Sequence, residues 1–260
     1  MRRIYVCSDN ITGLFSAVYD AWIERRESGD AGIAFKGNLE SELFCEYVES
    51  EESEKKVAAV EKMIRIHLGM EAYRRLYYAA LAEDLRKGDA ILGTMFAARK
   101  IKNSKKIMEY LTNPSVEKVF ELSRRVGNEV HYYKEFIRFK ELEGGILFSR
   151  IDPKSQVLTC VAPHFSNRFP LENWMIYDGT HQMCVVHEAR KNWVLVSAAE
   201  VAVDALERYS DGEREIQKLW KGFFESISIK ERESYVRQRQ HLPLWYRINM
   251  VEFEQNQVPL

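Results

Sequence analysis

The sequence predicts an α+β protein. Its expected parts are an antiparallel β-meander of five or six strands, an N-terminal β-α-β start, a helical insert and C-terminal helices packed on the sheet. Two spacings of apolar residues favour this class: every three or four positions over residues 55–131, and every second position after residue 135. We expect one α+β unit over residues 1–260, with the insert at 55–131 and a C-terminal domain over about 132–260.

The N-terminal start is expected to run strand, helix, strand. Residues 3–8 read as a strand, and Ser8-Asp9-Asn10 offers good helix N-caps. The apolar residues of the helix recur at three and four positions, at Ile11, Leu14, Phe15, Val18 and Trp22. Residues 32–36 follow as a second strand. Because no G-x-G-x-x-G is present, a nucleotide site here is disfavoured.

The insert is predicted to be helical throughout. Apolar stripes run over residues 57–68, 73–85, 91–101 and 114–130. The chain before it, Glu40–Glu54, holds seven glutamates and no basic residue, and the third helix ends in Arg99–Lys106, with five basic residues and no acid. Solvated surface is the ordinary interpretation of either run, although a local basic patch can bind phosphate.

The meander is predicted from alternation and turn residues. Strands are expected at residues 135–142, 146–151, 157–161, 174–177, 182–187 and 193–196. Asp178-Gly179 is a hairpin signal between two of them. The strongest amphipathic stripe of the chain follows, at Ile216, Leu219, Trp220, Phe223, Phe224 and Ile227. We expect that helix to pack on the sheet.

Composition limits the class of protein. The formal net charge is −1, from 38 Lys and Arg against 39 Asp and Glu, which excludes a protein coated in positive charge. The four cysteines form no C-x-x-C pair, which disfavours zinc ribbons and iron–sulfur sites and fits reduced thiols. No apolar run is long enough for a membrane span or a signal peptide. We expect a cytoplasmic protein with no membrane contact, metal or cofactor.

A candidate site lies in the stretch Ala162–Glu188. Pro163 is expected to start a short helix and Pro170 to end it. Within it His164 and Arg168 are four apart and share a face, which Phe165 and Phe169 would anchor from the adjacent face. Arg can bind phosphate through two hydrogen bonds and His can transfer protons. A turn pinned by side-chain hydrogen bonds is the alternative.

A second polar group precedes it at a predicted helix-to-strand junction. Glu129 and His131 would share a face only if the helix has ended there, and the carboxylate would then orient the imidazole as a general base. A histidine at a helix end is the alternative. We expect Glu129, His131 and His164 to be the catalytic candidates, converging with Arg138 and Arg168.

The C-terminal segment mixes basic and aromatic residues, a combination typical of phosphate contact and base stacking. The candidates for nucleic-acid or phosphate contact there are Lys230, Arg232, Arg237, Arg239, Tyr246 and Arg247. A metal site at His181 and His187 is disfavoured, because six residues of regular strand would separate them by ~20 Å.

Combined motifs over nearly the whole chain resemble a bacterial family of DNA metabolism or repair proteins. They are AVYDAW after Gly13-Leu14, ExHxxxxFIRFxEL from Glu129 to Leu142, and PHFSNRF from Pro163 to Phe169. The tail LWKGFFESISIKER…LPLWYRINMVEF resembles that family's C-terminal domain of unknown function, which is sometimes fused to a uracil-DNA-glycosylase-like domain. The resemblance implies a gene neighbour, a radical-SAM protein similar to spore photoproduct lyase.

Three hypotheses of function follow. The first is a DNA repair or metabolism accessory protein that binds nucleic acid or docks with the radical-SAM partner. The second is an enzyme acting on a nucleotide or nucleic-acid base through a Glu/His/Arg pocket. The third is a structural adaptor without nucleic-acid contact. No nucleophile elbow, Walker loop or H-E-x-x-H occurs, so the sequence leaves open whether the protein is an enzyme.

Overall fold

The computed structural model describes residues 2–24, 31–39, 43–200, 209–226 and 234–256. The chain forms two compact units, residues 1–127 and 128–260. Their division falls within helix α5 (Pro114–Phe136). None of the helices in the described residues has the length and apolar character needed to cross a membrane.

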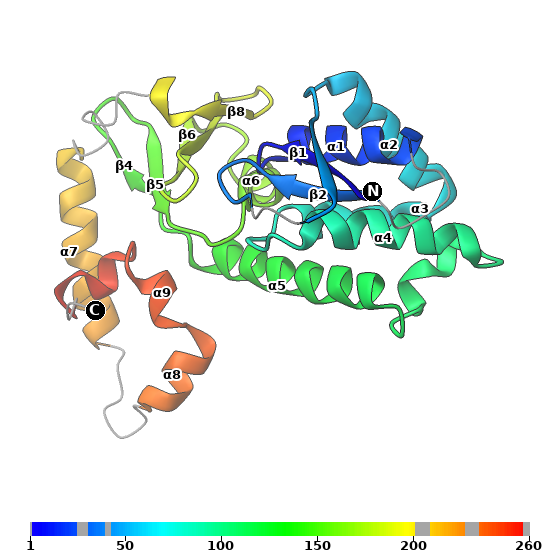
Figure 1. The fold of residues 1–260 in the computed structure, drawn as a ribbon. Helices are drawn as coiled ribbons and strands as arrows, with labels where there is room; N and C mark the ends of the chain where they lie inside the picture. Colours follow the sequence, from blue (N-terminus) through cyan, green and yellow to red (C-terminus); the bar gives the residue numbers. More distant parts are fainter. Residues whose placement is uncertain (1, 25–30, 40–42, 201–208, 227–233, 257–260) are drawn as a thin grey trace. The chain divides into compact units, whose positions relative to one another are not determined.

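The first unit contains a parallel three-stranded sheet in the order β2-β1-β3, formed by Arg2–Cys7 (β1), Ala31–Phe35 (β2) and Cys45–Glu49 (β3) (Figure 1). Helix α1 (Ile11–Glu24) joins β1 to β2, which confirms the β-α-β start. The Asn10 side chain caps α1 by accepting a hydrogen bond from the Gly13 N–H at 2.7 Å.

Strand β3 was not predicted, because it lies inside the run of glutamates. Both of its carboxylates are paired: Glu46 accepts hydrogen bonds from Arg3 on the adjacent strand β1, and Glu49 pairs with Lys36, which follows the end of β2. Ion pairing between strands therefore allows an acidic segment to join the sheet.

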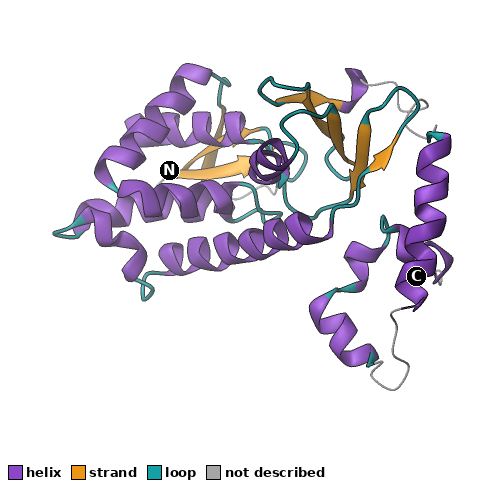
Figure 2. Cartoon of the chain, turned by 180° about the vertical axis from the view of Figure 1, so that it is seen from behind, coloured by secondary structure: helices purple, strands orange, loops and turns teal. Residues whose placement is uncertain are grey.

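Four further helices complete the unit with α5, and their predicted stripes are buried at Val60, Ile64 and Leu76. These elements are α2 (Glu54–His67), α3 (Gly69–Ala80), α4 (Lys87–Lys100) and the 3-10 helix η1 (Ser104–Glu109). Figure 2 shows that helices make up most of this part of the chain.

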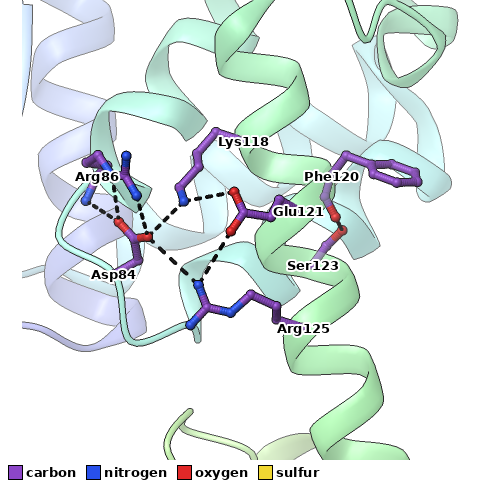
Figure 3. Close-up of polar contacts among 7 residues, drawn as sticks. All are labelled: Asp84, Arg86, Lys118, Phe120, Glu121, Ser123 and Arg125. Atoms are coloured by element: carbon purple, nitrogen blue, oxygen red, sulfur yellow. Dashed lines mark hydrogen bonds and ion pairs between the residues drawn. The ribbon is translucent and has the colours of Figure 1, made fainter.

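The turn between α3 and α4 is joined to α5 by the carboxylate of Asp84 (Figure 3). Asp84 accepts hydrogen bonds from the Arg86 backbone and guanidinium at 2.9 to 3.2 Å, and Lys118 Nζ lies 2.9 Å from its Oδ2. Burial raises the pKa of Asp84, but hydrogen bonds from Arg86 and Lys118 outweigh it and hold the pKa well below its usual range.

The second unit contains a five-stranded sheet in the order β4-β5-β6-β7-β8. The strands are Lys140–Glu141 (β4), Leu147–Ile151 (β5), Trp174–Asp178 (β6), Met183–His187 (β7) and Val194–Ser197 (β8). Antiparallel pairing joins β4 to β5, β6 to β7 and β7 to β8, which confirms the hairpin at Asp178-Gly179. The α+β class is correct.

The prediction of a wholly antiparallel meander is wrong, because β5 and β6 are parallel. Residues 157–161, predicted as a strand, instead begin helix α6 (Leu158–Arg168). The helix buries Leu158, Val161, Ala162 and Phe165, a spacing of three and four. A helical crossover brings the chain back in the same direction, so the sheet is mixed. Pro163 accordingly lies inside the helix and does not start it.

The predicted strand at residues 135–142 is also shorter than expected, since α5 continues to Phe136 and β4 has two residues. The core of the sheet is formed by apolar side chains on one face: Leu142, Phe148, Met175, Tyr177, Cys184 and Ala198.

The C-terminal helices are α7 (Asp211–Ser226), α8 (Tyr235–His241) and α9 (Leu244–Arg247), with η2 (Ala198–Glu200) before them and η5 (Val251–Asn256) after. Helix α7 meets the sheet at its edge, where Glu213 accepts a hydrogen bond from the β4 backbone at 3.0 Å. Its stripe does not pack on the sheet as predicted, because Ile216, Leu219 and Phe223 are exposed. The Phe224 side chain and Ile227 lie outside the described residues.

Candidate phosphate-binding surface

Helix α6 carries His164 and Arg168, and aromatic packing on another face of the helix holds it in place. On its buried side, Phe165 and Phe169 make edge-to-face contacts with Phe139, at centroid distances of 5.1 and 5.7 Å. The predicted anchor is therefore confirmed. His164 is half-buried and Arg168 is exposed, one helical turn apart.

Lys134, in the last turn of α5, adds a second permanent positive charge to that of Arg168 near His164. Partial burial lowers the pKa of His164, and the positive charges of Lys134 and Arg168 lower it further. Within the residues that the structure describes, no ion pair neutralises Lys134 or Arg168. We call Lys134, His164 and Arg168 the α6 cationic surface. Such an uncompensated group suits an anion.

Glu129 and His131 do not join this surface. Both lie within α5, so positions two apart face different directions. Glu129 accepts hydrogen bonds from the backbone N–H groups of Lys154 and Ser155, at 2.7 and 3.2 Å. The exposed His131 Nε2 lies 3.0 Å from Glu135 Oε1, one turn along the helix. The predicted carboxylate–imidazole pair between Glu129 and His131 is therefore not formed.

Arg138 binds within its own unit. It donates a hydrogen bond of 3.2 Å to the buried carboxylate of Glu252 and another of 3.2 Å to the Glu135 carbonyl. It therefore fastens η5 to the chain after α5. With Arg150 and Tyr246 it also lines a small pocket, so two of the predicted contact residues lie together.

Tyr246 packs among the rings of α5, with centroids 5.0 Å from Tyr132 and 4.9 Å from Tyr133. Burial raises the pKa of its hydroxyl. The neighbouring Trp245 indole donates a hydrogen bond to the Asp152 carbonyl at 2.6 Å. These two rings anchor the tail to the unit, which limits the surface they offer to a base.

Arg237 and Arg239 are exposed on α8, and the described residues include no acidic partner for either. Tyr235 beside them is also exposed. Arg247 instead donates hydrogen bonds to the Leu242 carbonyl at 3.0 and 3.2 Å. Burial and the charge of Arg239 lower the pKa of Arg247. Lys230 and Arg232 lie outside the described residues.

The sequence interpretation missed one polar pair at the β6–β7 turn. His181 Nδ1 lies 2.7 Å from Asp178 Oδ2, while Asp178 Oδ1 accepts the N–H groups of Thr180 and His181 at 3.0 Å each. Asp178 is buried, so the carboxylate holds both turn and imidazole. The three-residue spacing across the turn was the available signal. Sequence reasoning considered only a metal site at His181 and His187, which lie six positions apart.

His187 is a core residue, whose ring stacks on Trp174 at 4.9 Å and whose Nδ1 lies 3.0 Å from the Glu172 carbonyl oxygen. Across the described ranges, no three His, Cys, Asp or Glu side chains gather in a way that could hold a metal ion.

Comparison with known proteins places the chain in one family. No curated protein matches it. Residues 86–252 match the family described as a domain of unknown function, DUF4130. This range includes α6, α8 and the whole five-stranded sheet. Because the match covers more than half of the 260 residues, the chain belongs to the DUF4130 family.

Proposed function

We propose that the protein binds nucleic acid and acts as an accessory in DNA metabolism or repair. The observation that carries this proposal is the α6 cationic surface, whose charges no acid in the described residues offsets. A guanidinium grips phosphate oxygens through paired hydrogen bonds, and an ammonium adds a point charge. The family resemblance supplies the link to DNA. Docking with a radical-SAM repair-like protein is part of the same proposal.

Helix α8 supports the proposal with a second group of charges. Arg237 and Arg239 are exposed, and the exposed ring of Tyr235 could stack on a base. Contacts of this kind bind single strands with little sequence preference and weaken as salt rises.

The test is a salt titration of binding to single-stranded and damaged duplex DNA, measured by fluorescence anisotropy. We expect R168E to reduce the slope of log K against log[salt] by about 1, the value of one lost phosphate contact. K191E is the matched control, because Lys191 is exposed but already pairs with Glu188 at 2.7 Å. If the affinity for DNA does not change with salt concentration and is unchanged in R168E and R237E/R239E, phosphate contact is excluded.

The second candidate function, an enzyme acting on a nucleotide or base, is favoured by Asp178 and His181 alone. The buried carboxylate fixes the imidazole as in general-base sites. Turnover of a nucleotide by the native protein, lost in H181A but retained in R168E, would support it. The third candidate, an adaptor, is the outcome if a protein partner co-purifies but DNA does not bind.

A further inference from the structure

The basic run of the first unit forms a second charged surface, at the end of α4 and the start of η1. Lys100, Lys102 and Lys105 are all exposed, and no described acidic side chain forms an ion pair with them. We call these residues the η1 lysine surface. Lys106 differs, because its Nζ lies 3.4 Å from Glu109.

Most other basic side chains of the unit are neutralised, which makes this surface distinct. Lys87 pairs with Asp9 at 2.5 Å, Lys56 with Asp20 at 2.8 Å, and Lys118 with Asp84 and Glu121 at 2.9 Å each. Paired charges cancel at a distance, whereas the three lysines add to one another. The three lysines at the start of η1 therefore form a local cluster of positive charge without paired acids among the described residues.

The backbone that carries these lysines is held in place. Asn103 caps η1 by accepting the Lys105 N–H at 3.2 Å, and the Ser104 hydroxyl donates to the His67 carbonyl at 2.7 Å. Ile107 and Met108 are buried beneath the helix. Because this backbone is already ordered, binding an extended anion would cost less conformational entropy than binding to a flexible loop.

Two exposed apolar side chains, Ile66 and Met70, flank the junction of α2 and α3 beside Lys105. Gly69, between these helices, has φ +88°, and a Cβ there would lie 3.9 Å from Lys105 Cγ. Two such side chains are too few for the apolar face by which amphipathic helices enter a membrane. They do not hinder contact with a hydrophilic polyanion.

We infer that the η1 lysine surface is a second contact for the phosphate backbone of nucleic acid, separate from the α6 cationic surface. Lysine ammonium groups contact phosphates without reading bases, so the contact is independent of sequence. The choice of nucleic acid as the polyanion rests on the proposed function. The charged surface itself does not depend on that proposal.

The test compares K102E/K105E with K55E/R124E in the full chain, by anisotropy over a salt series. Lys55 and Arg124 are exposed in the same unit, so the control reverses the same number of charges elsewhere. We expect K102E/K105E to reduce the salt slope by about 2 and to weaken single-stranded and duplex DNA alike. The control should leave the slope unchanged, with circular dichroism verifying that both variants are folded.

Three results would overturn the inference, and they separate its failure from failure of the proposed function. If K102E/K105E binds like K55E/R124E while R168E binds weakly, only the second surface is excluded. If neither the native protein nor any variant binds DNA, the proposed function and the second contact surface are both excluded. If K102E/K105E abolishes binding to phosphatidylserine vesicles but not to DNA, the partner is a membrane surface.

Discussion

The position of His164 couples phosphate binding to protonation of its imidazole. Burial and the charges of Lys134 and Arg168 lower its pKa in the free protein, whereas a bound phosphate would raise it. The complex therefore takes up a proton, and we expect affinity for DNA to increase as pH falls from about 7.5 to about 5.5, around the ordinary value of ~6.5. Anisotropy at constant ionic strength measures this.

H164A should flatten that dependence, and H131A is the control. His131 is exposed and pairs with Glu135, away from the α6 cationic surface. An equal pH dependence in H164A and the native protein would show that another group takes up the proton.

Asp178 should contribute more to stability than the imidazole it holds. D178A leaves two backbone N–H groups without their acceptor, so we expect the free energy of unfolding in urea to fall by about 2–4 kcal/mol. H181A keeps both of those bonds and should cost less. A larger loss in H181A would contradict this account of the turn.

Sequence reasoning succeeded at residue scale where contacts are local. His164 and Arg168 were found together because four positions along a helix bring side chains to one face. Lys134 was missed, because its approach depends on how the end of α5 meets α6. Arg138 was predicted to contact phosphate, and its buried partner Glu252 could not be foreseen because it lies 114 positions away.

Helix α6 shows where element-scale prediction failed. Residues 157–161 are rich in β-branched side chains, which favour strands in isolation. Their helical spacing continues into Phe165, and burial of that stripe outweighs local preference. The helical spacing is visible only when residues on both sides of Pro163 are considered together, since the helix begins five positions before that proline.

The anchor of α6 gives an element-scale prediction. Phe165 is buried against Phe139, so F165A should lower the free energy of unfolding by about 3–5 kcal/mol. Phe169 is half-buried, and F169A should cost clearly less. Urea unfolding followed by circular dichroism measures both losses. Equal losses would mean that the two rings share the anchor.

Asp84 connects the α3–α4 turn to α5, and its protonation should loosen that connection. Its folded pKa lies below the unfolded value of ~3.9, so its stabilisation is fully present above pH ~4 and is lost as pH falls below that. We expect D84N to lower the free energy of unfolding at pH 7 by about 3 kcal/mol and at pH 3 by less. Urea unfolding at both values measures it, and equal losses would contradict the linkage.

At the scale of the whole molecule, the two compact units raise the question of cooperativity. The sequence predicts one α+β unit, and that stays a prediction, while α5 runs through the division at residue 127. Each unit has a sheet and buried side chains of its own. We expect D84N to speed amide hydrogen exchange in α2, α3 and α4 and to leave β6 and β7 unchanged. Equal acceleration in both would show one cooperative unit.

The parallel pairing of β5 with β6 determines the order in which the strands of the second unit can pair during synthesis on the ribosome. The strands β6, β7 and β8 are joined by short connections and can pair soon after they emerge. β5 emerges earlier than these strands. Its five-residue partner β6 is available only after residues 152–173, which include the crossover helix α6, have been made. Its other neighbour, β4, has two residues. A translational pause before residue 174 would leave the edge of β5 unpaired and able to pair with strands of other nascent chains. A pause after β7 has emerged would allow β5 to pair with β6 first.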